Sequence, residues 1–270
     1  MADVKGIHIS YQYQKDHKIL DDIEFTIKSG KLTVILGKNG CGKSTLVKLI
    51  TALLPLTEGT IYINDIDING NNGRKILREH CGIVFQNPDN QFVSPIVEDD
   101  IKFGLSNHHI PENQFENRIE TALNEVGLNG FEKRAVSTLS GGQKQLAAVA
   151  GIFAVDNDIF IFDEAASMLD PQGKEELNSC IRKLRNQQKT IILITQDIYD
   201  ALAADDVILM ADQKIIRAGT VREILTDYDL LQQAGVNIPF PVRVYHDLQN
   251  NGVRLSRCPL FIEELAEVLC

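Results

Sequence analysis

The sequence predicts an α/β fold built on a mainly parallel sheet with helices on both faces. Three observations lead to this prediction. Short strand-like runs alternate with longer helical runs along most of the chain, and that order favours parallel strands. A glycine-rich turn at residues 37–45 joins the strand KLTVILG to a helix. With 270 residues, 44% hydrophobic and 24% charged, the chain can bury the core of one large domain and carry an extension.

The predicted strands are short apolar runs. VKGIHISY and ILDDIEFTI interleave polar with apolar residues, whereas KLTVILG is almost continuously apolar. The remaining strand-like runs, in order, are EGTIYIN, CGIVF, DIFIFDE, TIILIT, VILM and KIIRAGT. Ligands bind such sheets at the carboxyl ends of the strands, so the residues that follow these runs are candidate site residues.

Three longer segments have apolar residues at helical spacing: residues 44–54, residues 111–128 up to Gly127, and the segment after Asp170 and Pro171, a cap and first-turn pair. The inward positions are Leu46, Leu49, Ile50 and Leu53 in the first, Ile119, Ala122, Leu123 and Val126 in the second, and Leu177, Cys180, Ile181 and Leu184 in the third. YDALAA predicts a short helix, and FIEELAEVL another near the end of the chain.

Composition and charge exclude several function classes. A net charge of -10 argues against a nucleic-acid phosphate backbone as the main partner. No run of 18 apolar residues exists, and the start MADVKGIHIS lacks the blocks of a secretion signal, so we expect a cytosolic chain unless another subunit carries it to a membrane. Five widely spaced cysteines without a C-x-x-C pair argue against a disulfide framework and a zinc site.

The segment GKNGCGKST fits the pattern G-x-x-x-x-G-K-[ST] and stands where that motif belongs, between a strand and a helix. Its glycines permit positive φ and close approach, so that backbone N–H groups and the helix N-terminus can surround phosphate oxygens. Lys43 is expected to reach the β- and γ-phosphates and Ser44 to bind Mg²⁺. The predicted ATP-binding residues of this loop are Gly37, Asn39, Gly40, Cys41, Gly42, Lys43, Ser44 and Thr45.

A second strand, IFIFDE, ends in adjacent carboxylates. Asp163 suits the Mg²⁺ shell, through a water or Ser44, and Glu164 suits polarising an attacking water. A strand that ends in two acids is often merely solvated. In a chain that also carries the glycine-rich loop, however, the pair predicts nucleotide hydrolysis.

The segment LSGGQKQLAAVA predicts a second anion-binding helix N-terminus, at Ser140, Gly141 and Gly142. A chain that binds one nucleotide does not need two such sites. The surplus therefore suggests that this helix faces an ATP held by another subunit. An ordinary capped helix is the alternative for S-G-G alone, but it explains the whole string poorly.

With LSGGQ between GKNGCGKST and IFIFDE, the chain resembles the ATP-binding subunits of ATP-binding cassette (ABC) transporters over nearly its whole length. The resemblance implies a P-loop NTPase fold of ABC type with a mainly parallel sheet, antiparallel N-terminal strands and a helical signature subdomain at about residues 88–155. The implied domains are an ATPase domain at 1–225 and a small C-terminal extension at 226–270, which we expect to support dimerisation.

The resemblance also assigns further residues. Tyr13 matches the aromatic that stacks on adenine, with a plain strand-end tyrosine as the alternative, and Gln86 in VFQNP matches the Q-loop glutamine that contacts Mg²⁺ and the attacking water. Asp170 matches the D-loop aspartate near the dimer interface. The implied catalytic residues are Glu164, Gln86, Gln196 and Lys43; the implied Mg²⁺ ligands are Ser44, Gln86 and Asp163; the implied signature residues are Ser140, Gly141, Gly142 and Gln143.

Three stretches, VFQNPDNQFVSPIVEDDIKFGL, SMLDP and GVNIPFPVRVYHDLQNNGVRL, are similar to the first of the two paralogous ATPases of energy-coupling factor (ECF) importers. This resemblance implies a prokaryotic ATPase heterodimer on the cytoplasmic face of the membrane, bound to a scaffold subunit and a substrate-binding membrane subunit, that drives uptake of a vitamin, another micronutrient or a metal ion. The acidic residues Glu98, Asp99 and Asp100 could receive scaffold arginines, or form a solvated turn. Another ABC importer, or a soluble ABC ATPase not engaged in transport, is the alternative function.

Gln196 departs from the family pattern, because it stands after the TIILIT strand where the family has a histidine that contacts the γ-phosphate. Histidine can become a cation near pH 7 and glutamine cannot. Glutamine still offers an amide donor to a phosphate oxygen and a carbonyl acceptor to water. Two interpretations therefore compete: the site that contains Lys43 still turns over, or it binds ATP firmly but hydrolyses it slowly. Because Glu164 is present, we favour the first.

Overall fold

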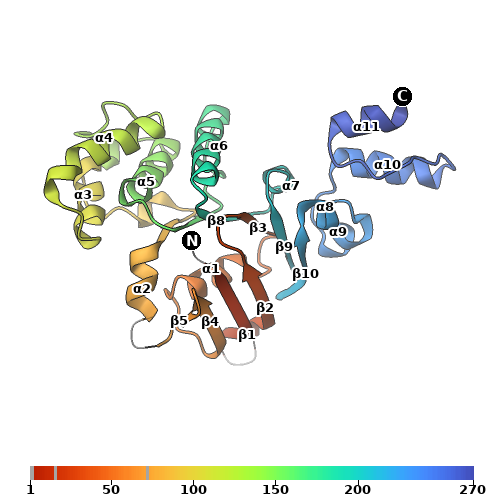
Figure 1. Ribbon diagram of the computed structural model, residues 1–270, viewed down its shortest axis with the longest axis horizontal. Helices are drawn as coiled ribbons and strands as arrows, with labels where there is room; N and C mark the ends of the chain where they lie inside the picture. The colour runs from red at the N-terminus through yellow and green to blue at the C-terminus, as the bar shows by residue number, and fades with distance from the viewer. Residues whose placement is uncertain (1–2, 15–16, 71–72) are drawn as a thin grey trace. The chain divides into compact units, whose positions relative to one another are not determined.

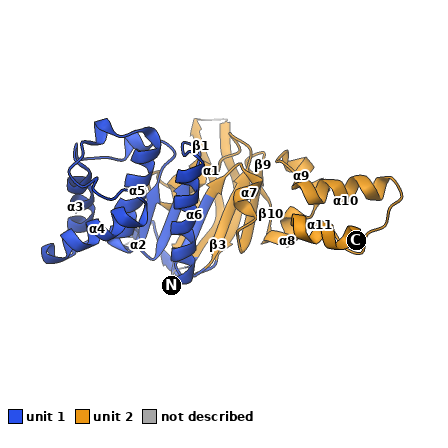
Figure 2. Cartoon of the chain, turned by 90° about the horizontal axis from the view of Figure 1, so that it is seen from above, with its two compact units in different colours: residues 1–3, 28–30, 63–193 blue, residues 4–27, 31–62, 194–270 orange. Residues whose placement is uncertain are grey.

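The computed structural model describes residues 3–14, 17–70 and 73–270, and they form an α/β fold. The chain divides into two compact units (Figure 2). Unit 1 comprises residues 1–3, 28–30 and 63–193, and unit 2 comprises residues 4–27, 31–62 and 194–270. This division does not follow the predicted domain boundary at residue 225, which stays a prediction. Each unit is described in turn.

Unit 2 contains two groups of strands (Figure 1). β1 (Val4–Gln14) pairs antiparallel with β2 (His17–Ile27), and β4 (Glu58–Ile63), whose last residue belongs to unit 1, follows β1 in the sheet order. The second group has the order β10-β9-β3. There β3 (Leu32–Gly37) is parallel to β9 (Asp206–Ala211), and β10 (Lys214–Thr220) is antiparallel to β9. The antiparallel N-terminal pair and the buried strand β3, all of whose residues are buried, confirm the sequence-based expectation.

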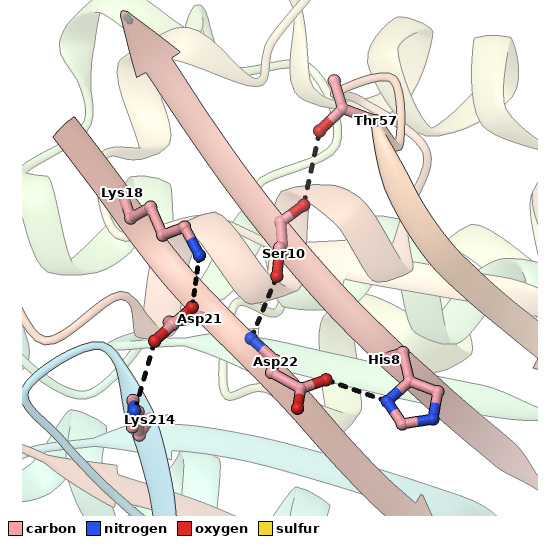
Figure 3. A network of polar contacts seen from close by, with 7 residues as sticks. All are labelled: His8, Ser10, Lys18, Asp21, Asp22, Thr57 and Lys214. Carbon is pink, nitrogen blue, oxygen red and sulfur yellow. Dashed lines mark hydrogen bonds and ion pairs between the residues drawn. The ribbon is translucent and has the colours of Figure 1, made fainter. Parts of the chain in front are cut away.

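Polar contacts link β2 to β1 and to Lys214 of β10 (Figure 3). His8 Nδ1 lies 2.8 Å from Asp22 Oδ1, and the backbone N–H of Asp22 donates to Ser10 Oγ at 3.0 Å. Asp21 links the ammonium groups of Lys18 and Lys214, at 2.5 and 3.2 Å. The contact between His8 and Asp22, whose side chains are both exposed, contributes little to stability.

The helices of unit 2 follow its strands. α1 (Lys43–Ile50) comes directly after the glycine-rich loop, and α7 (Ile198–Ala201) follows β8. The C-terminal part contains α8 (Val221–Leu225), α9 (Tyr228–Ala234), α10 (Phe240–Asn250) and α11 (Ile262–Leu269). The predicted first helix is shorter than expected: it ends at Ile50, and Ala52 has a φ of 51° that a helix cannot contain. Leu53, expected to face inward, is 56% exposed.

Unit 1 contains a helical part beside parallel strands (Figure 1). β6 (Cys81–Val84) is parallel to β7 (Ile159–Asp163), and β8 (Thr190–Thr195), which crosses the unit boundary after residue 193, precedes β7 in the order β8-β7-β6. The helices are α2 (Gly73–His80), α3 (Val97–Asn107), α4 (Phe115–Glu125), α5 (Gly141–Val155) and α6 (Pro171–Asn186). The short elements are β5 (Ile66–Asp67) and the 3₁₀ turns η1 (Pro88–Asn90), η2 (Glu112–Gln114) and η3 (Val136–Thr138).

The helices α3, α4 and α5 pack against one another, as Figure 1 shows. The predicted inward faces are confirmed: all four expected residues of the 111–128 segment and all four of α6 are buried. Asp170 caps α6 by accepting from the N–H of Gly173 at 2.7 Å, as its position before Pro171 predicted. No sequence pattern predicted the helices α2, α3, α8, α9 and α10. None of the helices in the described parts of the chain is apolar over enough residues to cross a bilayer.

Candidate nucleotide-binding site

The glycine-rich loop lies in unit 2 between β3 and α1. Gly42 precedes the helix with a φ of 107°, and a Cβ there would lie 2.7 Å from Leu20 Cδ2 and 2.8 Å from the carbonyl oxygen of Ile19. Both the backbone conformation and the lack of space therefore require glycine. In the described residues no side chain caps α1, and its first turn carries no acid. A helix N-terminus of this kind binds phosphate oxygens.

Lys43 is almost fully buried, with 3% of its surface exposed. Its ammonium donates to the carbonyl oxygens of Gly37 at 2.7 Å and Lys38 at 2.9 Å. The side chain therefore folds back over the loop that carries it. A buried ammonium group requires such partners, because removing the charge from water is costly. Lys43 is thus held in place as a fixed positive charge at the loop.

Tyr13 lies beside the first turn of α1. Its hydroxyl is 3.4 Å from Thr45 Oγ1, and its ring, 53% exposed, meets the ring of Tyr11 edge-on at 5.1 Å. An exposed aromatic surface next to the phosphate-binding loop has the position that stacking on an adenine base needs. The proximity of Tyr13 to the loop supports this role over that of a plain strand-end tyrosine.

Cys41 and Asn39 complete the loop. Cys41 is buried, and its Sγ fills the space beside Gly37, where a Cβ would lie 2.7 Å away. Burial raises the pKa of the Cys41 thiol, with Lys43 opposing the effect. The cysteine is therefore a small packing residue and a poor nucleophile. Asn39 is exposed at the tip of the loop.

Gln196 is an exposed residue in the turn between β8 and α7. The turn is held by its neighbours: Thr195 Oγ1 donates to Asp200 at 2.7 Å, and Asp197 caps α7 by accepting from the N–H of Tyr199 at 2.9 Å. The short helix α7 packs against β3, the strand that leads into the glycine-rich loop. Unit 2 thus carries Tyr13, the loop and α7, the helix that follows Gln196.

The catalytic candidates of unit 1 lie at the end of β7. Asp163, 4% exposed, is the last residue of the strand, and Glu164 follows it with a φ of 50°. A glutamate rarely adopts this left-handed conformation, which costs about 1–3 kcal/mol and is typical of functional sites. Gln86, which follows β6 after one residue, donates its Nε2 proton to Glu164 Oε2 at 2.8 Å. The structure therefore joins two predicted catalytic residues that are 78 positions apart.

The signature segment and the D-loop line one cavity in unit 1, with a volume of about 690 Å³. Ser140 and Gln143 form a capping box at the start of α5: Gln143 N–H donates to Ser140 Oγ at 3.2 Å, and Ser140 N–H donates to Gln143 Oε1 at 3.0 Å. A Cβ on Gly142 would lie 3.6 Å from the Met168 carbonyl oxygen. Asp170 also lines the cavity. Ser140, Gly141 and Gly142 thus line a cavity at the N-terminus of α5, and their contact with a partner's ATP stays a prediction.

Comparisons with known proteins agree with this geometry. The ABC transporter family model matches residues 20–167. The energy-coupling factor transporter ATP-binding protein EcfA1 of Clostridium novyi is 39% identical over 97% of this chain and 96% of its own length. The chain belongs to the ABC transporter family. Within it, the chain is an ATP-binding subunit of the energy-coupling factor type, which binds and hydrolyses ATP and works with membrane transporter partners.

Further relatives of this ABC subunit include the EcfA1 protein of Lactobacillus acidophilus, 41% identical over 97% of this chain and 94% of its own. Among solved structures, cbiO1 from Clostridium perfringens, part of the ABC transporter complex cbiONQ, has a TM-score of 0.74, 32% identity, and coverage of 91% of this chain and 98% of its own. The cassette MJ0796, in a dimeric post-hydrolysis state bound to ADP and Pi, has a TM-score of 0.75 and 27% identity, covering 81% and 99%. The predicted ABC fold is confirmed.

The acidic residues after the Q-loop are engaged within the ABC subunit itself. Glu98 pairs with Lys102 and Lys133, and Asp99 lies 3.4 Å from Lys102. Asp100 accepts the N–H groups of Val93 at 2.7 Å and Ser94 at 3.1 Å, and burial raises the pKa of its carboxyl group. Asp100 therefore stabilises its own loop, and only Asp99 keeps a mostly exposed carboxylate for a partner.

Sequence reasoning missed two glutamines near Gln86. Gln91 and Gln145 both hydrogen-bond to the backbone of Phe85, the residue before Gln86. One feature of the sequence could have identified Gln145: it is a polar residue that follows LSGGQK on the otherwise apolar side of the helix. No such feature identifies Gln91, because its contact depends on the path of the loop.

Proposed function

We propose that this chain is the ATP-hydrolysing subunit of an importer that takes up a vitamin, another micronutrient or a metal ion. It pairs with a paralogous ATPase and binds, from the cytoplasmic face, a membrane scaffold subunit that also holds a substrate-binding membrane subunit. The names of relatives that match nearly the whole chain, energy-coupling factor transporter ATP-binding proteins, support an energy-coupling factor transporter. The observation that carries the catalytic assignment is the 2.8 Å hydrogen bond from Gln86 to the strained Glu164.

In the proposed reaction, the backbone N–H groups of the loop and the ammonium of Lys43 bind the phosphates of ATP, and Tyr13 stacks on its base. The oxygen ligands Ser44, Asp163 and Gln86 suit Mg²⁺, which supplies charge neutralisation for the phosphates. Glu164 accepts a proton from the attacking water as the bond from water to the γ-phosphorus forms and the bond to ADP breaks. Gln86 holds the Glu164 carboxylate through its amide N–H, which fixes the direction in which the base points.

The second ATP of the pair is proposed to lie on the paralogous subunit and to enter the cavity formed by Ser140, Gly142 and Asp170. Hydrogen-bond donors at the start of α5 then contact its phosphates. Closure of the two subunits on both nucleotides supplies the force that the membrane subunits use.

The proposal is tested by purifying the chain with its proposed membrane subunits and measuring release of phosphate from ATP with and without Mg²⁺. We expect co-purification of a paralogous ATPase and membrane proteins, and turnover that requires Mg²⁺. Co-purification with ribosomes or DNA in place of membrane proteins would overturn the importer assignment and favour a soluble ABC ATPase.

Replacing Gln196 by histidine is expected to keep the ATPase rate of this site and to give it a new dependence on pH. Histidine titrates at a pKa of about 6.5, so the variant's rate should change between roughly pH 5.5 and 7.5 in a way that the wild-type rate does not. The measurement is a pH–rate profile in a complex whose partner has lost its own catalytic glutamate. A severe loss at every pH would contradict the interpretation that glutamine does the work of a histidine here.

Deletion of residues 240–270 is expected to weaken the pairing of the two ATPases. Ile262 and Leu269, 66% and 53% exposed on α11, offer apolar surface that a partner subunit can bury, whereas Leu265 is already buried in the chain. Because the deletion also removes that buried residue, the double variant Ile262→Glu/Leu269→Glu serves as the milder test. Analytical ultracentrifugation with the paralogue should show a higher dissociation constant, and an unchanged constant in both variants would exclude the dimerisation role.

A further inference from the structure

Gln145 is a fully buried amide on α5, with none of its surface exposed. Its Nε2 donates to the backbone carbonyl oxygen of Phe85 at 3.0 Å. Its Oε1 is buried and has no hydrogen-bond partner among the described residues. A buried polar group is costly unless it is hydrogen-bonded, so a glutamine that uses half of its capacity in this place requires a reason beyond packing.

The backbone of Phe85 is held on both sides by glutamine side chains. Gln145 donates to the carbonyl oxygen of Phe85, and the N–H of Phe85 donates to Gln91 Oε1 at 3.0 Å. Gln91 Nε2 also donates to the carbonyl oxygen of Ile83 at 3.2 Å. In the sheet order β6 is the terminal strand, so among the described residues these backbone groups lie at an edge. The two glutamines act in place of a neighbouring strand and fix the chain immediately before Gln86.

A second contact fastens the other end of the same loop. Lys144, the residue before Gln145 on α5, places its ammonium 2.5 Å from Asp89 Oδ1. Gln145 and Lys144, which are consecutive residues of α5, therefore hold Phe85 and Asp89, on either side of Gln86. The start of that helix, Ser140 to Gly142, lies less than two turns away along α5. One helix thus contacts both the loop of Gln86 and the cavity for the second nucleotide.

We propose that Gln145 is a positioning residue that ties the Gln86 loop to α5. A movement of α5 then changes the positions of the catalytic groups at both ATP sites. This inference rests on the proposed function of Gln86 and Glu164. Through Phe85 it orients Gln86, which in turn holds the Glu164 carboxylate of this chain's own site. Through the helix it orients Ser140 and Gly142, which serve the site of the partner. Loss of the Gln145 amide should therefore slow both sites, although it contacts neither nucleotide.

The test replaces Gln145 by methionine, which keeps the length of the side chain and removes its donor. Each ATP site is measured separately in the assembled complex. With Glu164→Gln present, turnover reports the partner's site; with the partner's corresponding glutamate changed, it reports this chain's own site. Gln145→Met is expected to lower turnover by roughly tenfold to a hundredfold in both backgrounds, as expected for groups displaced from their reactive positions. Binding of a fluorescent ATP analogue to the chain should change by less than about twofold, because the loop of Lys43 is not contacted.

Asn157 provides a matched control. It is another buried amide, 4% exposed, whose Nδ2 donates to the Ile152 carbonyl at 3.2 Å and whose Oδ1 has no partner in the described part of the chain. It contacts the far end of α5 and lies beside Gly82 of β6, but no hydrogen bond in the described residues joins it to Phe85 or Gln86. Asn157→Leu should therefore lower the melting temperature as Gln145→Met does, but leave turnover at both sites nearly unchanged.

A double variant separates positioning from general damage. In a Gln86→Ala background, Gln145→Met should cause no further loss at this chain's own site, because the two residues act in one chain of contacts, while the loss at the partner's site persists. Equal effects of Gln145→Met and Asn157→Leu on both rates, or fully additive losses with Gln86→Ala, would overturn the positioning role. If the wild-type complex hydrolyses no ATP, the proposed function itself fails, which is a different outcome.

Discussion

Replacing Glu164 by glutamine should nearly abolish ATP hydrolysis at the site that contains Lys43. The amide has almost the same size as the carboxylate but cannot accept a proton from water, and loss of a general base lowers rates by about 10² to 10⁴. The Gln86 amide can still donate to the new carbonyl oxygen, so the loop keeps its position. The measurement is single-turnover hydrolysis in a complex whose partner has lost its own catalytic glutamate.

Glu175→Gln is the matched control for this change. Glu175 is an exposed glutamate on α6 that pairs with Arg182 at 2.7 Å, and an exposed ion pair of this kind contributes little to stability. We expect the Glu175→Gln variant to hydrolyse ATP at the same rate as the wild type. If Glu164→Gln left the rate of this site untouched, Glu164 would not be the general base of the reaction there, and the catalytic assignment would be wrong.

Replacing Lys43 by methionine should weaken ATP binding by about tenfold to a hundredfold, the value expected when a charge-assisted hydrogen bond to phosphate is lost. Methionine fills a similar volume but has no charge, so the negative phosphate groups lose the fixed ammonium held by Gly37 and Lys38. The measurement is the dissociation constant for ATP by fluorescence or calorimetry, together with the melting temperature without nucleotide.

Lys48→Met is the control, since Lys48 stands one turn further along the same helix and is partly exposed. Its dissociation constant for ATP should match that of the wild type, which rules out a general effect of removing a positive charge from α1. An unchanged constant in Lys43→Met would show that the backbone of the loop alone holds the nucleotide.

The local motifs could be predicted because each depends on a few consecutive residues. Gly42 must be glycine in a strand-to-helix turn of this kind, and its φ of 107° agrees with that requirement. The cap of α6 by Asp170 is likewise a short-range feature, fixed within three residues of the chain. Helix ends were harder to predict: α1 stops at Ile50 although apolar spacing continues to Leu53, because the backbone turns at Ala52.

By itself, the sequence determined the α/β class, the phosphate-binding loop, the carboxylates at the end of β7 and the signature segment, since propensity, glycine chemistry and spacing act over short distances. Only the tertiary structure decided that Gln86 holds Glu164, that Gln145 holds the loop before Gln86, and that Asp100 accepts from the backbone of Val93 and Ser94. The first two contacts join residues 78 and 60 positions apart. The packing of β6, β7 and α5 brings these residues together, and no local sequence pattern predicts such contacts.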